Sequence, residues 1–101
     1  MKYKYEEGSL KVGLEEELDM KSCKALRSVI DGYIIRYQPE EFVMDLSKVK
    51  FMDSSGIGLL MGRYNLIKLM DSKMIIINPT SSIKRILELS NIAGNITMRC
   101  E

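Results

Sequence analysis

The stretch that decides the fold, residues 51–64, reads Phe-Met-Asp-Ser-Ser-Gly-Ile-Gly-Leu-Leu-Met-Gly-Arg-Tyr. An apolar run before it predicts a strand over residues 42–46. After a polar break, apolar residues return at helical spacing and predict a helix over residues 54–70. These helical positions are Ile57, Leu60, Met61, Tyr64 and Ile67. The sequence therefore predicts a strand, a polar elbow formed by residues 53–56, and a helix.

The elbow has two interpretations. Asp53, Ser54 and Ser55 are all short polar residues that cap helices by accepting bonds from first-turn N–H groups, with Gly56 and Gly58 relieving crowding. Alternatively, a hydroxyl at a helix N-terminus is a good place for a phosphate, because the free N–H groups and the helix dipole stabilise the dianion. A phosphate would add about −1.5 to −2 charges to the surface. The residues alone leave both interpretations open.

Two motifs carry a resemblance to a known family, namely Phe51-Met52-Asp53-Ser54-Ser55-Gly56-Ile57-Gly58 and Gly62-Arg63-Tyr64. Together they resemble the signature of the anti-sigma factor antagonists of the STAS domain family, especially the sporulation-type antagonist. In that family the first Ser of the Asp-Ser-Ser-Gly segment is phosphorylated by the partner, an anti-sigma factor that is itself a serine kinase. The resemblance implies phosphorylation of Ser54. It also implies partner contacts at Asp19, Asp53, Ser55, Gly56, Ile57 and Gly58.

An acidic loop, residues 15–19, precedes the first predicted helix and reads Glu-Glu-Glu-Leu-Asp. As a charge run it is typical of a solvated turn, and Asp19 is the expected N-cap. It also resembles the Gly-Glu-Leu-Asp segment of the family, whose Asp takes part in partner binding and phosphate handling. Glu16 stands where the family usually has Gly, and this extra charge has the potential to weaken phosphorylation or alter partner choice.

The rest of the chain predicts alternating strands and helices. Strands are expected at residues 2–6 and 9–14 as a hairpin around Glu7-Gly8, at 74–77 as a buried strand, and at 95–98. A helix from Asp19 ends at Gln38-Pro39-Glu40, and a short one follows Thr80-Ser81-Ser82. This alternation predicts one α/β domain over residues 1–101. The resemblance implies a STAS fold, a mixed four- to five-stranded sheet with helices mainly on one face.

The predicted helix over residues 54–70 is apolar on two sides. One stripe holds Ile57, Leu60, Tyr64 and Ile67, and the other holds Leu59, Leu66 and Met70, interrupted by Arg63. Such a helix is either wedged deep in the fold or lends one side to a partner. We expect partial burial together with a docking surface.

Composition excludes several classes of function. The 101 residues include no histidine, so a Cys/His zinc site and a Ser-His-Asp triad are excluded. Cys23 and Cys100 lie far apart and are expected as reduced thiols. Asp45 and Asp53 are expected in surface turns rather than as a catalytic pair. The glycines fit neither a dinucleotide fingerprint nor a P-loop. We therefore expect no enzyme, metal or cofactor.

The net charge of +1 and the dispersed basic residues argue against direct nucleic-acid binding. The apolar runs are too short to span a bilayer, and the N-terminus has no signal-like region, so we expect a cytoplasmic protein without a membrane partner. The main hypothesis is a phosphorylation-switched anti-anti-sigma factor that binds a serine kinase and is reset by a serine phosphatase. The alternatives are a STAS-type scaffold subunit without a phosphoswitch and a small nucleotide-binding domain.

Overall fold

The computed structural model describes residues 1–94 and 96–101. Its five strands form one sheet in the order β1-β2-β3-β4-β5. The first pair is antiparallel and the other neighbours are parallel, so the sheet is mixed, as predicted. The strands are β1 (Lys2–Glu6), β2 (Ser9–Gly13), β3 (Glu41–Asp45), β4 (Lys73–Ile77) and β5 (Thr97–Arg99).

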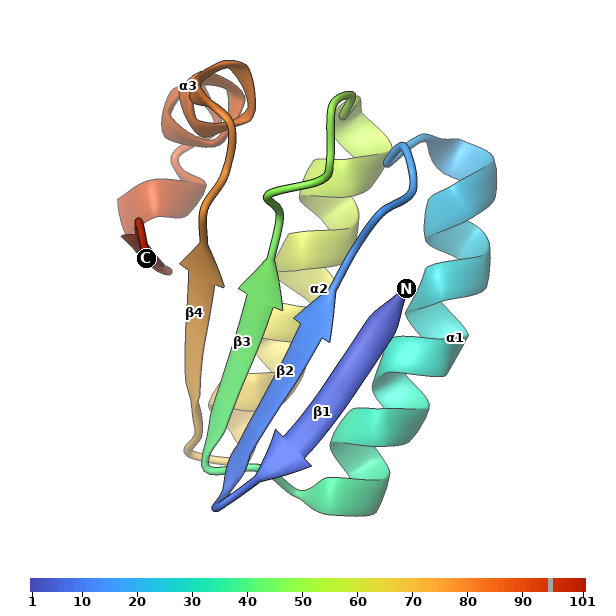
Figure 1. The fold of residues 1–101 in the computed structure, drawn as a ribbon, viewed down its shortest axis with the longest axis vertical. Helices are drawn as coiled ribbons and strands as arrows, with labels where there is room; N and C mark the ends of the chain where they lie inside the picture. The colour runs from blue at the N-terminus through green and yellow to red at the C-terminus, as the bar shows by residue number, and fades with distance from the viewer. Residues whose placement is uncertain (95) are drawn as a thin grey trace.

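Three α-helices follow the strands in the described residues, α1 (Met20–Tyr37), α2 (Ser54–Leu69) and α3 (Ser81–Leu89), with a 3-10 turn at Ile92–Gly94. Figure 1 shows α1 and α2 side by side behind the sheet, with α3 beyond the end of β4. The prediction of one α/β sheet with helices mainly on one face is confirmed. Within residues 1–94 and 96–101, no helix is long and apolar enough to cross a membrane.

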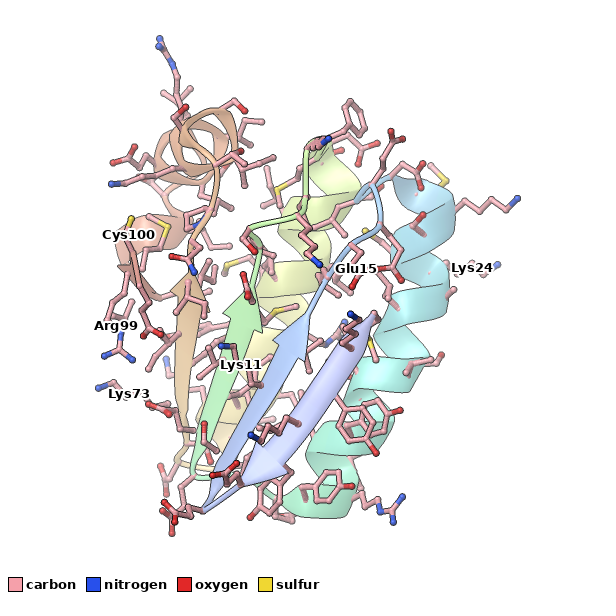
Figure 2. All side chains as sticks on the ribbon, in the orientation of Figure 1. Lys11, Glu15, Lys24, Lys73, Arg99 and Cys100 are labelled. Carbon is pink, nitrogen blue, oxygen red and sulfur yellow. The ribbon has the colours of Figure 1, made fainter. Side chains whose placement is uncertain are left out.

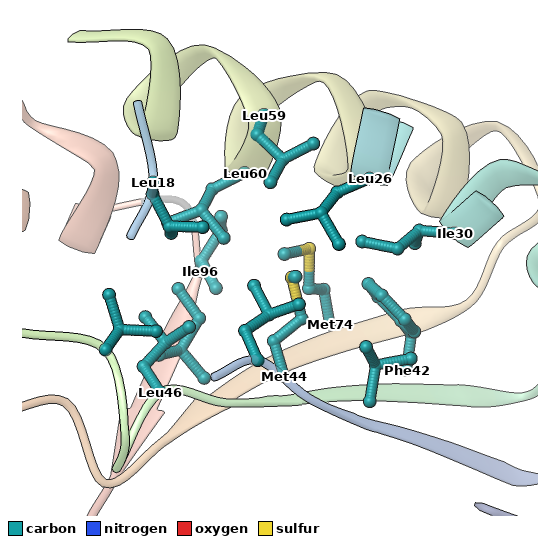
Figure 3. Packing of buried hydrophobic residues seen from close by; sticks show 14 of the residues in the cluster. Leu18, Leu26, Ile30, Phe42, Met44, Leu46, Leu59, Leu60, Met74 and Ile96 are labelled. Carbon is teal, nitrogen blue, oxygen red and sulfur yellow. The ribbon is translucent and has the colours of Figure 1, made fainter. Parts of the chain in front are cut away.

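The core lies between the sheet and the two long helices. Figure 3 shows this packing, in which side chains of the two helices face side chains of the strands. The labelled residues include Leu26 and Ile30 of α1, Leu59 and Leu60 of α2, Phe42 and Met44 of β3, and Met74 of β4. Full burial of one such side chain contributes about 1.5–3 kcal/mol relative to exposure. Packing onto the sheet therefore contributes more to the stability of the two helices than local propensity does.

The hairpin and the buried strand are where the sequence places them. Glu7 and Gly8 have φ values of 50° and 80°, the left-handed pair that a two-residue hairpin turn requires. All four residues of Met74–Ile77 are buried. Ile75 and Ile77 form a second cluster with Val43, separate from the main core. Figure 2 shows Lys11, the β2 partner of Val43, on the same open face of the sheet.

The structure shifts several predicted boundaries. The strands expected at 9–14 and 42–46 run over Ser9–Gly13 and Glu41–Asp45, and the helix expected to reach residue 70 ends at Leu69. The last strand is Thr97–Arg99, not 95–98. Its start is later because the Ile96 N–H donates to the Ile92 carbonyl at 3.1 Å and so belongs to the preceding turn. Residue Asn95 of that prediction lies outside the described residues.

Arg63 interrupts the second apolar stripe of α2, and the structure adds that this arginine is buried, with only 5% of its surface exposed. Its Nε lies 2.8 Å from Asp31 Oδ1 of α1, so the charge is carried into the contact between the helices. The buried side of α2 consists of Gly56, Leu59, Leu60, Arg63 and Ile67. The expected partial burial is found, since Ile57, Tyr64, Leu66 and Met70 are half-buried.

Candidate docking site at two helix N-termini

The elbow and the acidic loop lie side by side. Leu18 and Met52 form a parallel bridge, although they lie in different loops. The Leu18 N–H donates to the Phe51 carbonyl at 3.0 Å, and the Asp53 N–H donates to the Leu18 carbonyl at 3.2 Å. These bonds extend the pairing of β2 and β3 beyond their carboxyl ends. They bring the N-termini of α1 and α2 together, at the kind of sheet edge where α/β proteins bind ligands.

Both helices begin with an aspartate cap, as predicted. Asp19 and Asp53 have extended backbones, and their Oδ1 atoms accept from the Ser22 N–H at 2.9 Å and the Ser55 N–H at 2.8 Å. The bond from the Ser22 backbone is the largest cause that holds the pKa of Asp19 below its ordinary value. The cap therefore favours the ionised carboxylate.

Ser54 is the first residue of α2, directly after the Asp53 cap. Its side chain is exposed, and its hydroxyl makes no hydrogen bond within the part of the chain that the structure describes. The first N–H groups of a helix have no intrahelical partner and attract anions. The structure thus places a free hydroxyl where a phosphate is compatible with the helix.

Gly56 is required by the contact between the two loops. A Cβ atom added there would lie 2.5 Å from Met52 Cγ and 2.9 Å from Leu18 Cβ. Gly58, two residues further along α2, is exposed and its added Cβ would meet no described atom within 4 Å. The prediction that both glycines relieve crowding is therefore confirmed for Gly56 and wrong for Gly58. Ser55 and Ile57, the remaining predicted contact residues, are half-buried.

Glu16 has a structural role that the sequence did not reveal. Its carboxylate lies 3.4 Å from the N-terminal ammonium of Met1 and accepts the Glu15 N–H at 2.9 Å. Burial raises the pKa of Glu16, but the backbone bonds from Glu15 and Glu16 and the terminal ammonium together lower it below its ordinary value. The Glu16 carboxylate is thus paired with groups at the start of the chain and in its own loop.

Cys23 lies on the first turns of α1, close to both caps. It is buried, and burial raises the pKa of its thiol. The carboxylates of Asp53 and then Asp19 raise that pKa further, because a thiolate beside two negative charges is disfavoured. The thiol is a neutral filler between the helices. Cys100, by contrast, is exposed and free.

The remaining candidates do not form a catalytic or metal centre. Asp45 Oδ1 accepts the Ser47 N–H at 2.9 Å in a turn, while Asp53 caps α2, so the two carboxylates have the separate turn roles we expected. In residues 1–94 and 96–101 no three His, Cys, Asp or Glu side chains gather as a metal site. Sequence reasoning missed Arg63 and Asp31, and the only local signal was an arginine inside an apolar helix.

The fold and the paired N-termini of α1 and α2 can now be compared with known protein families. The family model for the STAS domain matches residues 2–100, and the chain belongs to the STAS domain family. Within that family it is similar to the anti-sigma F factor antagonist of Paenibacillus polymyxa, with 36% identity over 85 residues, 84% of this chain and 73% of the relative. The resemblance drawn from the elbow is confirmed. Such antagonists are regulatory binding proteins, which agrees with the expectation that the chain is no enzyme.

Two solved structures show the same fold. The anti-sigma factor antagonist SpoIIAA in its unphosphorylated form superposes with a TM-score of 0.82 at 21% identity, covering 96% of this chain and 85% of that one. The Bacillus cell fate determinant SpoIIAA in its phosphorylated form gives a TM-score of 0.71 at 22% identity, covering 96% and 90%. At these identities the similarity concerns the fold.

Proposed function

We propose that this protein is a cytoplasmic anti-sigma factor antagonist whose binding is switched by phosphorylation of Ser54. In the unmodified form it binds an anti-sigma factor serine kinase, and this binding releases a sigma factor of the sporulation type. The observation that carries the proposal is the exposed Ser54 hydroxyl at the first position of α2, beside a second helix N-terminus. The similarity to an anti-sigma F factor antagonist supports the choice of partner.

The proposed contact surface is the elbow, Ile57, Gly58 and the capping end of the acidic loop at Asp19. It is a single surface because the bridge between Leu18 and Met52 holds its two parts together. Gly56 allows this close approach. The partner kinase thus meets Ser54 in the middle of the surface that it binds.

Phosphorylation changes the charge of this surface without requiring a change of fold. The phosphate adds about −1.5 to −2 charges at a helix N-terminus, where the positive end of the helix dipole stabilises a negative charge. The same negative charge is added within the surface proposed to bind the kinase, which already carries the Asp19 and Asp53 carboxylates. A loss of ~3 kcal/mol of binding free energy lowers affinity roughly a hundredfold, which is enough for a switch. A serine phosphatase then restores the binding form.

Intact-mass spectrometry tests this proposal. The protein is incubated with ATP and the serine-kinase anti-sigma factor from the same genome. One added phosphate is expected on the wild type and on Ser55→Ala, the neighbouring hydroxyl control, and none on Ser54→Ala. Ser54→Ala is expected to bind the kinase, and Ser54→Asp to bind it poorly. An active kinase that adds no phosphate would favour the alternative, a STAS-type scaffold subunit without a phosphoswitch.

A further inference from the structure

A groove of about 590 Å³ lies between α1 and α2 and begins beside the elbow. We call it the α1–α2 groove. Its α1 side includes Met20, Lys24 and Arg27, and its α2 side includes Gly58, Gly62 and Arg63. On α1 these positions are three or four residues apart, and on α2 Gly58 and Gly62 are four residues apart with Arg63 directly after Gly62, so each helix contributes one face. Figure 2 shows Lys24 extending away from α1 into solvent.

The α2 side of the groove is lined by glycines that the fold itself does not need. A Cβ added at Gly58 or Gly62 would meet no atom within 4 Å among the described residues. Glycine inside a helix weakens it relative to alanine. Gly56, in contrast, is held by Leu18 and Met52. Because Gly58 and Gly62 have no side chains, another chain can approach the backbone of α2 closely at these positions.

Arg63 supplies a buried guanidinium with unused hydrogen-bond donors in the wall of the groove. Its side chain is 93% buried, with 7% of its surface exposed. The distance from Nε to Asp31 Oδ1 is 2.8 Å, yet the pair is not aligned as a hydrogen bond. Nη1 is also buried and has no hydrogen-bond partner within residues 1–94 and 96–101. A buried guanidinium with unused donors is costly, and an acceptor brought by a ligand would lower this cost.

The charges of the groove favour an acidic occupant. Burial lowers the pKa of Arg63, Asp31 partly compensates, and the positive charge of Arg27 lowers the pKa further. The guanidinium groups of Arg27 and Arg63 therefore repel each other, with only the Asp31 carboxylate as a counter-charge. Lys24 adds a third positive charge to the groove. The capping carboxylates of Asp19 and Asp53 are not among the residues that line the groove, whose charged lining side chains are Lys24, Arg27 and Arg63. The lining of the groove is therefore positive.

The size of the groove favours a peptide segment over a single ion. Met20 and Arg27 are seven positions apart on one helix, a rise of about 10 Å. A chain segment can place one acidic side chain at the arginines and lay its backbone over the glycines. Helical and extended segments both bind in such clefts through a few side-chain anchors.

We propose that the α1–α2 groove binds an acidic segment of the anti-sigma factor, with a carboxylate of that segment accepting hydrogen bonds from Arg63 and Arg27. The identity of this partner rests on the proposed function. Ser55 lines the groove at the elbow end, and Ser54 is the residue directly before it. A phosphate on Ser54 therefore repels the same acidic segment that the groove attracts. This gives the switch a physical target beyond the elbow.

Charge reversal tests the groove in the full chain. Calorimetry measures the affinity of wild type, Arg27→Glu and Arg85→Glu for the purified serine-kinase anti-sigma factor. Arg85 is exposed on α3, away from the groove, and its substitution changes the net charge equally. Arg27→Glu is expected to weaken binding at least about tenfold, with a reduced salt dependence, and Arg85→Glu to change it less than about twofold. Thermal midpoints of all variants check that each one is folded.

A pair of glycine substitutions tests the same groove by shape. Gly62→Ala places a methyl group in the groove, and Gly32→Ala places one on the exposed side of α1, where the added Cβ also meets no described atom within 4 Å. Both substitutions are expected to raise the thermal midpoint, because alanine favours the helix. Only Gly62→Ala is expected to weaken binding, by roughly threefold to tenfold.

The outcomes separate the two proposals. If wild type and Arg85→Glu bind the anti-sigma factor and both groove variants bind equally well, the groove proposal is wrong while the proposed function stands. If wild type itself does not bind an active anti-sigma factor, the proposed function is wrong, and the groove loses the partner assigned to it. Loss of binding in Arg27→Glu and Gly62→Ala, with both controls intact, supports the groove.

Discussion

The N-termini of α1 and α2 are built alike and differ in what they present. Each follows a parallel strand and begins at an aspartate whose carboxylate accepts a first-turn N–H. After its cap, α1 presents Met20, which is 76% exposed, whereas α2 presents the hydroxyl of Ser54. The third helical residue also differs, since α1 has the bulkier Ser22 where α2 has the tightly enclosed Gly56.

This comparison shows that a cap alone does not make a functional helix start. The hydrogen bonds of the two caps are nearly equal in length, so capping cannot distinguish them. What distinguishes α2 is an exposed hydroxyl in its first turn and a glycine that allows the other loop to lie against it. The capping and phosphate interpretations of the elbow are therefore compatible, because Asp53 supplies the cap and leaves Ser54 free.

The largest expected effect comes from closing the space at Gly56. Gly56→Ala forces the new methyl group against Leu18 and Met52, so the two N-termini must separate. We expect the free energy of unfolding to fall by about 1–3 kcal/mol, the usual cost of overpacking. Urea unfolding followed by circular dichroism measures it.

Gly58→Ala is the matched control, on the same helix but facing open space. Alanine there is expected to raise the free energy of unfolding by up to about 1 kcal/mol, because glycine weakens a helix interior. Equal effects of the two substitutions would contradict the distinction between a crowded and an open glycine in α2.

The sequence predicted those parts of this region that depend on residue type and local order. Both caps, the start of α2 and the hairpin follow from short polar side chains and from glycine at a left-handed turn. The crowding at Gly56 did not follow, because the atoms that crowd it include those of Leu18 in another loop. The pattern DSSGIG makes Gly56 and Gly58 look equivalent, and only the folded pairing of the loops separates them.

Charge pairs between residues far apart in the chain also could not be predicted from the sequence. Arg63 and Asp31 are neighbours only because α1 and α2 pack with a particular rotation, and the local pattern marks Arg63 as unusual in an apolar helix without indicating its partner. Similarly, Glu16 departs from the family pattern but is paired with the N-terminal ammonium, which comes from the start of β1. A charge read from the sequence says what sign a loop carries, while its effect depends on the partner that the fold brings to it.

A smaller effect is expected at the Asp19 cap of α1, where the pH dependence of stability separates the contribution of the carboxylate charge from that of the hydrogen bond. The folded-state pKa of Asp19 is lowered chiefly by the Ser22 backbone N–H, so the ionised carboxylate stabilises the fold. This contribution is present above the unfolded-state pKa and is lost as the pH falls through the folded-state pKa. The Asp19→Asn variant keeps a capping oxygen without a titrating group. Its stability relative to wild type is therefore expected to improve on acidification.

Urea midpoints of wild type and Asp19→Asn, taken from neutral pH to about pH 3, measure this difference. The wild type is expected to be the more stable protein at neutral pH, with an advantage that shrinks as Asp19 becomes protonated. A difference between the two proteins that stays constant across this range would mean that the cap acts only as a hydrogen bond.

The smallest expected effect uses Cys23 as a reporter between the caps. Burial and the Asp53 and Asp19 carboxylates raise the pKa of its thiol, so little thiolate is present at neutral pH. A thiol reagent is expected to modify exposed Cys100 at least about ten times faster than Cys23. In a Cys100→Ser background, Asp53→Asn removes one negative charge but keeps a capping oxygen, and it is expected to speed modification of Cys23 modestly. Mass spectrometry measures both rates.

The order of these two rates decides whether the junction of the N-termini stays closed in solution. If Cys23 were modified as fast as Cys100, the space between α1 and α2 would open often enough to admit the reagent, and neither the burial nor the carboxylates would control the thiol. If Asp53→Asn left a slow rate unchanged, burial alone would account for it. Faster modification of Cys23 in Asp53→Asn, at unchanged stability, would show that the Asp53 carboxylate at the start of α2 acts electrostatically on the first turns of α1.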